Sequence, residues 1–147
     1  MVVKLNEVVT FGKSGSVAEM EPYGFDLSEP GHSWTRDEVA GFSLSLGGTV
    51  PLDTAIRLHI TARPFIQPGH VERQQFFVFV NGLHVGFRTV TAATDVQFVL
   101  PRNALSPRST RVEFVIPTAL SPKSLGISQD VRRLGIALSA VSFNSQK

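Results

Sequence analysis

Hydrophobic and polar residues alternate with a period of two along most of this 147-residue chain. In residues 39–46 every even-numbered position is apolar, and the segments 55–63, 95–100 and 111–116 alternate in the same way. Strict alternation is typical of antiparallel strands that turn one face to a core and the other to solvent. No segment beyond the short stretch 121–127 follows the helical period of about 3.6 residues. The pattern therefore predicts an all-β protein.

The clearest local signal lies in QQFFVFVNGLHVGFR, residues 74–88, where Asn81 and Gly82 separate two strand-like runs. Asn-Gly is the preferred centre of a two-residue type I′ hairpin, because both turn positions need a positive φ. Such a turn fixes how the two strands pair. The pairs expected to face the core are Val80–Leu83, Val78–Val85 and Phe76–Phe87. The pairs expected to face outward are Phe79–His84, Phe77–Gly86 and Gln75–Arg88.

The last strand-like run, residues 133–143, changes the phase of its alternation, which indicates a β-bulge near residues 139–140. Together with an opening strand in residues 3–11, the runs amount to about eight strands. Turn-forming clusters separate them, among them residues 46–53. Eight strands with connections of mixed length favour two stacked antiparallel sheets, a jelly-roll-like β-sandwich, over an immunoglobulin-like one. The length fits a single domain over residues 1–147.

The composition is that of a folded and weakly charged protein, with 42% hydrophobic and 18% charged residues. Eleven phenylalanines against one tryptophan indicate a core filled by phenylalanine. The formal net charge is only +2 and the basic residues are scattered, so nucleic acid is disfavoured as a partner. The chain shows neither a signal-peptide pattern nor an apolar run long enough to span a membrane, so we expect no membrane insertion. It has no cysteine, which fits a reducing compartment, and we expect a cytoplasmic protein.

Catalytic patterns are weak throughout the chain. The segment GKSGS, residues 12–16, ends like a phosphate-binding loop, but the pattern needs a glycine at position 7, where Glu7 stands. The four histidines show no paired spacing, although a metal site assembled from distant strands stays open. No Gly-x-Ser-x-Gly elbow occurs either. The sequence therefore predicts no catalytic residue, no cofactor and no metal ligand.

Two polar groups lie beside strand starts and are the first candidates for a site. Glu29 precedes Trp34 by five residues, and Asp130 precedes Arg132 at the start of the last run. Because the first and last strands of a sandwich are often neighbours, we expect Glu29 to pair with Arg132. A partly buried carboxylate needs such a partner. We expect Trp34 to close the open end between the two sheets, with an exposed sugar platform as the alternative, since large aromatic residues are mostly buried.

Five segments of the chain resemble a known family when they are taken in order. They are GFDLSEPGHSWT (24–35), LHITARPF (58–65), VFVNGLHVG (78–86), FVIPTALSPKSLG (114–126) and DVRRLGIALSAV (130–141). Over residues 24–143 the chain is similar to bacterial accessory β-sandwich domains joined to glycosyltransferases and phosphoglycerol-transferase-like enzymes of cell-envelope polysaccharides. The resemblance implies a non-catalytic setting in a polysaccharide pathway.

These observations favour a carbohydrate-binding or polysaccharide-pathway accessory module, whose partner is a glycan or a glycosyltransferase-type protein. Sugar rings stack on aromatic side chains, and their hydroxyls hydrogen-bond to charged and amide groups. The candidate ligand-binding residues are Glu29, Trp34, Phe77, Phe79, His84, Arg88, Asp130 and Arg132. The outward phenylalanines alternatively lie under another segment of the chain, or dock a partner protein or a second copy. An enzyme on a sandwich scaffold is the third hypothesis, and the oligomeric state is not predicted.

Overall fold

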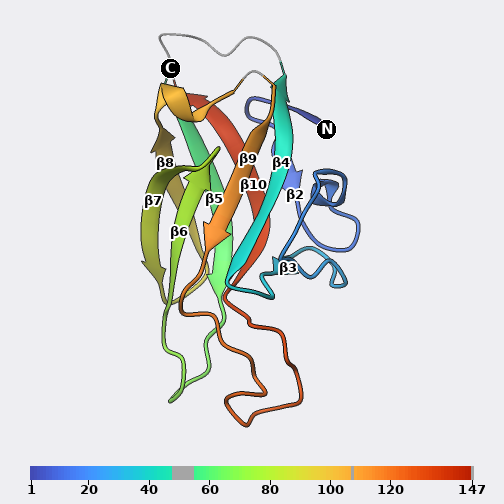
Figure 1. The fold of residues 1–147 in the computed structure, drawn as a ribbon, viewed down its shortest axis with the longest axis vertical. Helices are drawn as coiled ribbons and strands as arrows, with labels where there is room; N and C mark the ends of the chain where they lie inside the picture. The colour runs from blue at the N-terminus through green and yellow to red at the C-terminus, as the bar shows by residue number, and fades with distance from the viewer. Residues whose placement is uncertain (48–54, 107, 147) are drawn as a thin grey trace.

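The computed structural model describes residues 1–47, 55–106 and 108–146, and these residues form ten strands and two short 3₁₀ turns (Figure 1). The strands are β1 (Val2–Lys4), β2 (Val8–Thr10), β3 (Ser33–Trp34), β4 (Val39–Gly47), β5 (Ala55–Pro64), β6 (Gln74–Val80), β7 (Leu83–Val90), β8 (Thr94–Leu100), β9 (Thr110–Val115) and β10 (Ile136–Gln146). The 3₁₀ turns are Ser16–Glu19 and Arg102–Ala104. The turn expected at residues 46–53 lies mostly outside the described residues. None of the described residues belongs to a helix that is long and apolar enough to cross a membrane.

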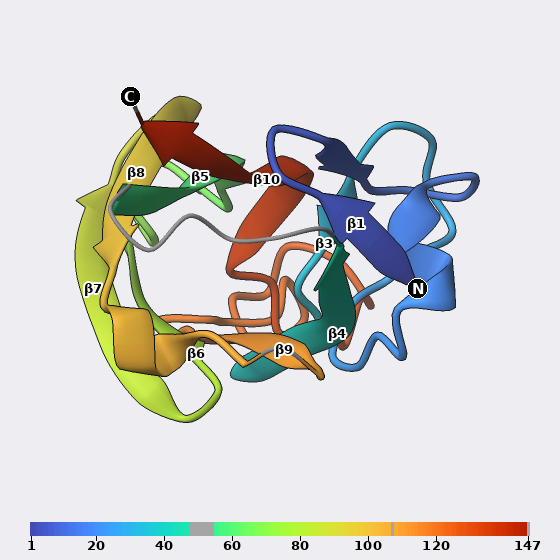
Figure 2. The ribbon, with the colours of Figure 1, turned by 90° about the horizontal axis from the view of Figure 1, so that it is seen from above.

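The strands form two sheets that face each other, as the end-on view in Figure 2 shows. The first sheet has the order β1-β4-β9-β6-β7, and the second has the order β2-β10-β5-β8 with β3 also paired to β10. From β3 to β10 every connection changes sheet except the β6–β7 hairpin. This winding of eight strands is that of a jelly roll. The predicted β-sandwich is confirmed. It has ten strands rather than eight, because the opening run forms two short strands, β1 and β2, and the two-residue strand β3 was not predicted.

Phenylalanine fills the space between the sheets, as the composition indicates. Phe42, Phe76, Phe114 and Phe143 are fully buried, and the ring centroids of Phe76 and Phe114 lie 6.4 Å apart. Burying one such side chain stabilises the fold by about 1.5–3 kcal/mol. The core therefore comes from the inward positions of the alternating runs on both sheets.

The hairpin turn forms as predicted, but the predicted pairing of its two strands is wrong beyond the first two pairs. Asn81 and Gly82 have φ values of 49° and 81°. Val80 pairs with Leu83 and Phe79 with His84, and then the register shifts between Val78 and Phe79. After this shift the pairs are Val78–Gly86, Phe77–Phe87, Phe76–Arg88 and Gln75–Thr89. Val85 is thus the extra residue of a β-bulge, and the following residues of β7 exchange faces.

Close packing between β7 and β8 accounts for the new phase. Gly86 lies so near the ring of Phe98 that a Cβ there would meet a ring carbon at 2.0 Å. Arg88 follows on the same side, with its guanidinium 4.4 Å from the centroid of the Phe98 ring. Nη2 of Arg88 donates to the carbonyl oxygen of Gln97 at 2.9 Å. Phe87, expected in the core, is instead 39% exposed on the outer face.

The bulge expected in the last strand is confirmed. The pairing of β10 with β5 shifts between Leu138 and Ala140, so that Leu138 lies opposite Ala62 and Ala140 opposite Thr61. The extra residue is Ser139. It lets Ile136 and Leu138 on one side of the bulge, and Val141 and Phe143 on the other, all face the core.

Candidate functional site

Trp34 lies on the outer face of the second sheet, and the expectation that it closes the gap between the sheets is wrong. Strand β3 places Trp34 opposite Ala137 of β10, and Ala137 lies opposite Arg63 of β5. Residues paired across strands share a face. The chain neighbours Ile136 and Leu138 are buried in the core, so this row points away from it.

Two small polar residues hold β3 in this register. The hydroxyl of Ser33 accepts a hydrogen bond from the N–H of Gly12 at 2.8 Å, and that of Thr35 accepts one from Ile136 at 3.1 Å. Both side chains are fully buried. Because successive residues of a strand point to opposite faces, the residue between them must point outward.

The half-buried indole of Trp34 has polar and aromatic neighbours. The guanidinium carbon of Arg63 lies 5.2 Å from the ring centroid, and the rings of His32 and Phe65 meet the indole edge-on at 6.3 Å. Nε2 of His32 donates to Oε2 of Glu29 at 2.8 Å, so His32 links the indole to Glu29.

The second polar group predicted from the sequence, Asp130 and Arg132, also contacts Asp26 and Glu29. We call these four residues the Arg132 clamp. Nη1 of Arg132 lies 2.7 Å from Oδ2 of Asp26 and 3.4 Å from Oε1 of Glu29. Its Nη2 lies 2.6 Å from Oδ2 of Asp130, and its Nε also donates to Asp130. The predicted approach of Glu29 to Arg132 is therefore confirmed. Asp26 was not predicted as part of this group, although the pattern Asp26-Leu-Ser28 indicates a turn in which the carboxylate accepts a hydrogen bond from the N–H two residues on.

Hydrogen bonds hold two carboxylates of the clamp, those of Asp26 and Asp130, in their charged form. The hydroxyl and N–H of Ser28 lower the pKa of Asp26, and Arg132 lowers it further. The hydrogen bonds from Arg132 lower the pKa of Asp130. The pKa of Arg132 is raised, chiefly by its hydrogen bond to Asp130.

The clamp fastens the long connection between β9 and β10. This connection folds back on itself through a bridge between Leu120 and Leu134, and the carbonyl of Asp130 accepts a bond from Lys123. All three nitrogens of the Arg132 guanidinium already donate to carboxylates. Asp130 and Arg132 therefore act as a structural ion pair that holds the loop.

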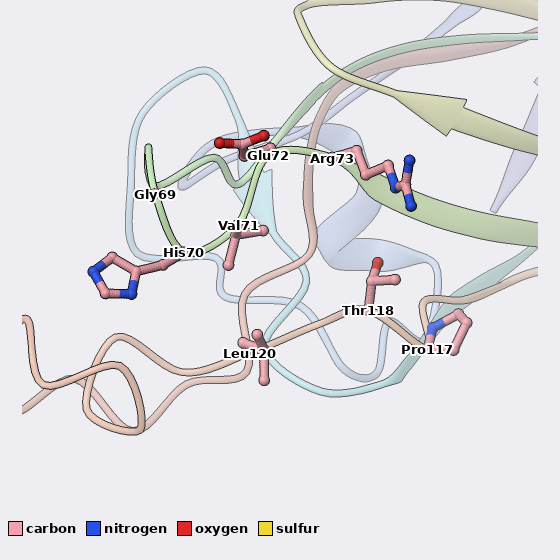
Figure 3. A pocket seen from close by; sticks show the side chains of 8 residues that line it. All are labelled: Gly69, His70, Val71, Glu72, Arg73, Pro117, Thr118 and Leu120. Carbon is pink, nitrogen blue, oxygen red and sulfur yellow. The ribbon is translucent and has the colours of Figure 1, made fainter.

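The fastened connection forms one wall of a pocket of about 640 Å³, and the β5–β6 connection forms the other (Figure 3). Its lining residues are Gly69, His70, Val71, Glu72, Arg73, Pro117, Thr118 and Leu120. The Thr118 hydroxyl is occupied, because it donates to Oε1 of Gln74 at 2.6 Å and accepts from the N–H of Gln75. Figure 3 shows the ring of His70 pointing away from Thr118. No Phe, Tyr or Trp is among the described lining residues, so the pocket lacks a flat ring on which a sugar could stack.

A second hollow, of about 280 Å³, lies on the outer face of the second sheet. It is lined by Arg57, His59, Gln97, Asn144 and Ser145. We call the outward side chains of β5, which are Arg57, His59, Thr61 and Arg63, together with Trp34 and the lining of this hollow, the β5 face. Alternation predicts the polar side of residues 55–63, but no site was predicted there.

The candidate residues Phe77, Phe79 and His84 lie together on the outer face of the first sheet. The ring of His84 lies 5.6 Å from that of Phe77 and 5.3 Å from that of Phe79. Phe87 joins them opposite Phe77, where Gly86 was expected, with its ring 4.8 Å from that of Phe77. The candidate Arg88 lies instead on the inner side of β7, over the ring of Phe98. The bulge in β7 explains this exchange.

Cross-strand pairing extends this group into the apolar row, which comprises Val39, Val115, Phe77 and Phe87 on β4, β9, β6 and β7. The expected cover is partial. Tyr23 packs over Gly41 on β4, and its hydroxyl donates to Oε2 of Glu113 at 2.5 Å. Burial and this hydrogen bond raise the pKa of Tyr23 to about 12.

Among the described residues, no group of three or more His, Asp or Glu side chains is arranged to hold a metal ion.

The sequence matches no protein-family model and no curated protein sequence.

Solved structures with the same fold include a carbohydrate-binding module. The CBM36-1 domain of a multidomain xylanase, from the hindgut metagenome of Trinervitermes trinervoides, aligns with a TM-score of 0.51 at 6% identity. The alignment covers 95% of this chain and 97% of that domain.

Two larger proteins also contain the fold. A family GH115 4-O-methyl-α-glucuronidase with specificity for decorated arabinogalactans aligns with a TM-score of 0.53 at 13% identity, over 89% of this chain and 17% of its own. The mosquito-larvicidal Cry4Aa toxin of Bacillus thuringiensis aligns with a TM-score of 0.51 at 6% identity, over 99% of this chain and 25% of its own. This chain thus spans a quarter or less of either protein. At such identities the likeness shows the fold, a β-sandwich that occurs in proteins of different activities.

Proposed function

We propose that the chain is a non-catalytic carbohydrate-binding module that binds a glycan on the β5 face. The observation that carries the proposal is the outward position of Trp34, in one row with Arg63 and at the end of a line of hydrogen-bonding side chains. Aromatic rings stack on the apolar faces of sugars, and Arg, His, Gln and Asn bond to their hydroxyls. The β5 face combines both kinds of group on one rigid sheet.

The comparison with CBM36-1 supports a binding module over an enzyme, because this chain covers nearly the whole of that domain. The partner enzyme rests on the sequence resemblance alone. We propose that the module works beside a glycosyltransferase-type enzyme of polysaccharide synthesis, and that it does so in the cytoplasm.

The experiment follows ligand binding through the fluorescence of Trp34, because Trp34 is the single tryptophan of the chain. Oligosaccharides of xylan, cellulose, arabinogalactan and pectin are titrated, and the emission of Trp34 is followed. A ligand that stacks on the indole shifts this emission. Calorimetry with the same ligand then compares Trp34→Ala with Phe87→Ala, which removes an aromatic side chain from the opposite face of the molecule.

We expect Trp34→Ala to weaken binding about tenfold, since an aromatic contact contributes about 0.5–1.5 kcal/mol in addition to the apolar area that it buries. Phe87→Ala should bind like the parent chain. Loss of binding in Phe87→Ala alone would place the glycan on the first sheet. Unchanged emission and no heat with any glycan would refute the proposed function.

The second candidate function is protein interaction, and the observation that favours it is the apolar row. Large apolar patches on a monomer commonly mark interaction sites. Under this alternative the row pairs with a second copy of the chain. Light scattering would then report a dimer, and Phe87→Lys would convert it to a monomer.

A further inference from the structure

Three basic side chains of β5 lie in one line on the β5 face. Arg57, His59 and Arg63 occupy outward positions of the strand, whereas the residues between them are buried. With a rise of about 3.3 Å per residue, Arg57 and Arg63 lie about 20 Å apart along the strand. This line is long enough to contact several successive sugars of an extended chain.

The strands beside β5 place few acidic groups next to this line. Gln97 and Ser142 lie opposite His59. On the described outer positions of β8 and β10, Asp95 is the one carboxylate that pairs with β5. Asp95 lies opposite Thr61 and accepts a hydrogen bond from its hydroxyl at 2.6 Å.

The surroundings of Arg63 fix its orientation. Its guanidinium lies over the indole of Trp34, and its Nη2 lies 3.2 Å from Nε2 of His32. The side chain is otherwise exposed to solvent. A guanidinium that stacks on a ring keeps its N–H groups directed outward in one plane, the geometry that binds carboxylate or phosphate with two parallel hydrogen bonds.

The acidic residues nearest to this end of the face are already occupied. Glu29 bonds to His32 and contacts Arg132, and Asp26 and Asp130 are held by Arg132 as well. The clamp therefore neutralises part of the negative charge beside Arg63. The β5 face presents cations, hydrogen-bonding groups and one indole.

From this arrangement we propose that the glycan bound on the β5 face is anionic, with carboxylate or phosphate groups along a linear chain, and that Arg63 binds one of these groups. This inference rests on the proposed function and names the class of its ligand. A neutral glycan has no charged group that could pair with the guanidinium of Arg63.

The test compares ligands that share their sugar rings and differ in charge. Oligogalacturonides and their methyl esters have the same sugar rings, but the esters carry no carboxylate. A phosphodiester-linked hexose oligomer forms a third arm, which tells phosphate from carboxylate. Affinities are measured by calorimetry at low and at physiological salt for the parent chain, Arg63→Gln, Arg63→Lys and Arg111→Gln. The control residue Arg111 lies on the first sheet.

We expect an anionic ligand to bind at least about tenfold tighter than the neutral ester, because a hydrogen bond to a charged group contributes about that factor. Raising the salt should weaken only the anionic ligand. Arg63→Gln should reduce the preference to about twofold, Arg63→Lys should keep part of it, and Arg111→Gln should leave it intact. Melting curves verify that each variant is folded.

Equal affinity for the acid and its ester would overturn the inference and leave the proposed function standing. A preference for anions that persists in Arg63→Gln would also overturn it, whatever the effect of Arg111→Gln. The proposed function itself fails only if no glycan binds, charged or neutral.

Discussion

Replacing Gly86 by alanine tests the register of the β6–β7 hairpin. A Cβ at this position would lie 2.0 Å and 2.1 Å from two carbons of the Phe98 ring, far inside the contact distance of about 3.5–4.0 Å. Phe98 is 4% exposed, and Arg88 lies over its ring, so the ring has little room to move away. Overpacking of this kind costs about 1–3 kcal/mol, and loss of the cation–π contact adds about 0.5–1 kcal/mol. We expect Gly86→Ala to destabilise the fold by about 3 kcal/mol in total.

Urea unfolding measures this change. For a slope of about 2 kcal/mol per molar urea, the midpoint should fall by about 1.5 M. The double variant Gly86→Ala/Phe98→Leu removes the ring that the new methyl group meets, so its destabilisation should be smaller than the sum of the single variants. Strict alternation would instead place Gly86 on the outer face, where alanine stabilises a strand by about 0.5–1 kcal/mol. A variant as stable as the parent chain would refute the bulge at Val85 and return Arg88 to the outer face.

Two further substitutions test the core and the clamp. Phe76→Ala should cost about 3–5 kcal/mol in urea unfolding, because the side chain is fully buried and leaves a cavity against Phe114. Arg132→Met should cost about 2 kcal/mol at pH 7, between the values for an exposed and a buried ion pair. The pKa values of Asp26 and Asp130 are lowered in the folded state, so the clamp stabilises fully above their unfolded pKa of about 3.9 and is lost as the pH falls through the folded values. The difference between the parent chain and Arg132→Met should therefore shrink near pH 3, and an equal difference at both pH values would contradict this role.

The long strands were predictable because their signal is local. Alternation determines which residues of β4, β5, β8 and β9 face the core, and the Asn81-Gly82 turn and the bulge in β10 each leave a mark in the sequence. Strands β2 and β3 have three and two residues, too few to show a period. The bulge at Val85 was missed because its cause is tertiary. The approach of Gly86 to Phe98 depends on β8, and nothing within residues 83–88 reports it.

The candidate site was predictable in part for a similar reason. Glu29 and Arg132 are 103 positions apart, and their pairing was predicted from the expectation that the strand after Trp34 neighbours the last strand. The pairing forms by another route, because β3 pairs with β10 whereas β4 lies in the other sheet. The orientation of Trp34 could not be predicted, because two residues are too few to show an alternation. The pairing of β3 with β10 decides which face each side chain takes. The hollow beside His59 needs Gln97 and Asn144 from other strands, so the sequence of β5 alone could indicate only a polar face.

The outward position of Trp34 is itself an argument for a ligand. A shift of β3 by one residue would turn the indole inward, where burial of a large aromatic side chain stabilises a fold. The chain instead buries the hydroxyls of Ser33 and Thr35, and hydrogen bonds from Gly12 and Ile136 satisfy them. Burying polar groups brings little net stability even when they are hydrogen-bonded. The register of β3 therefore favours exposure of the indole over maximal burial, which is expected of a surface that binds another molecule rather than of one that only closes a core.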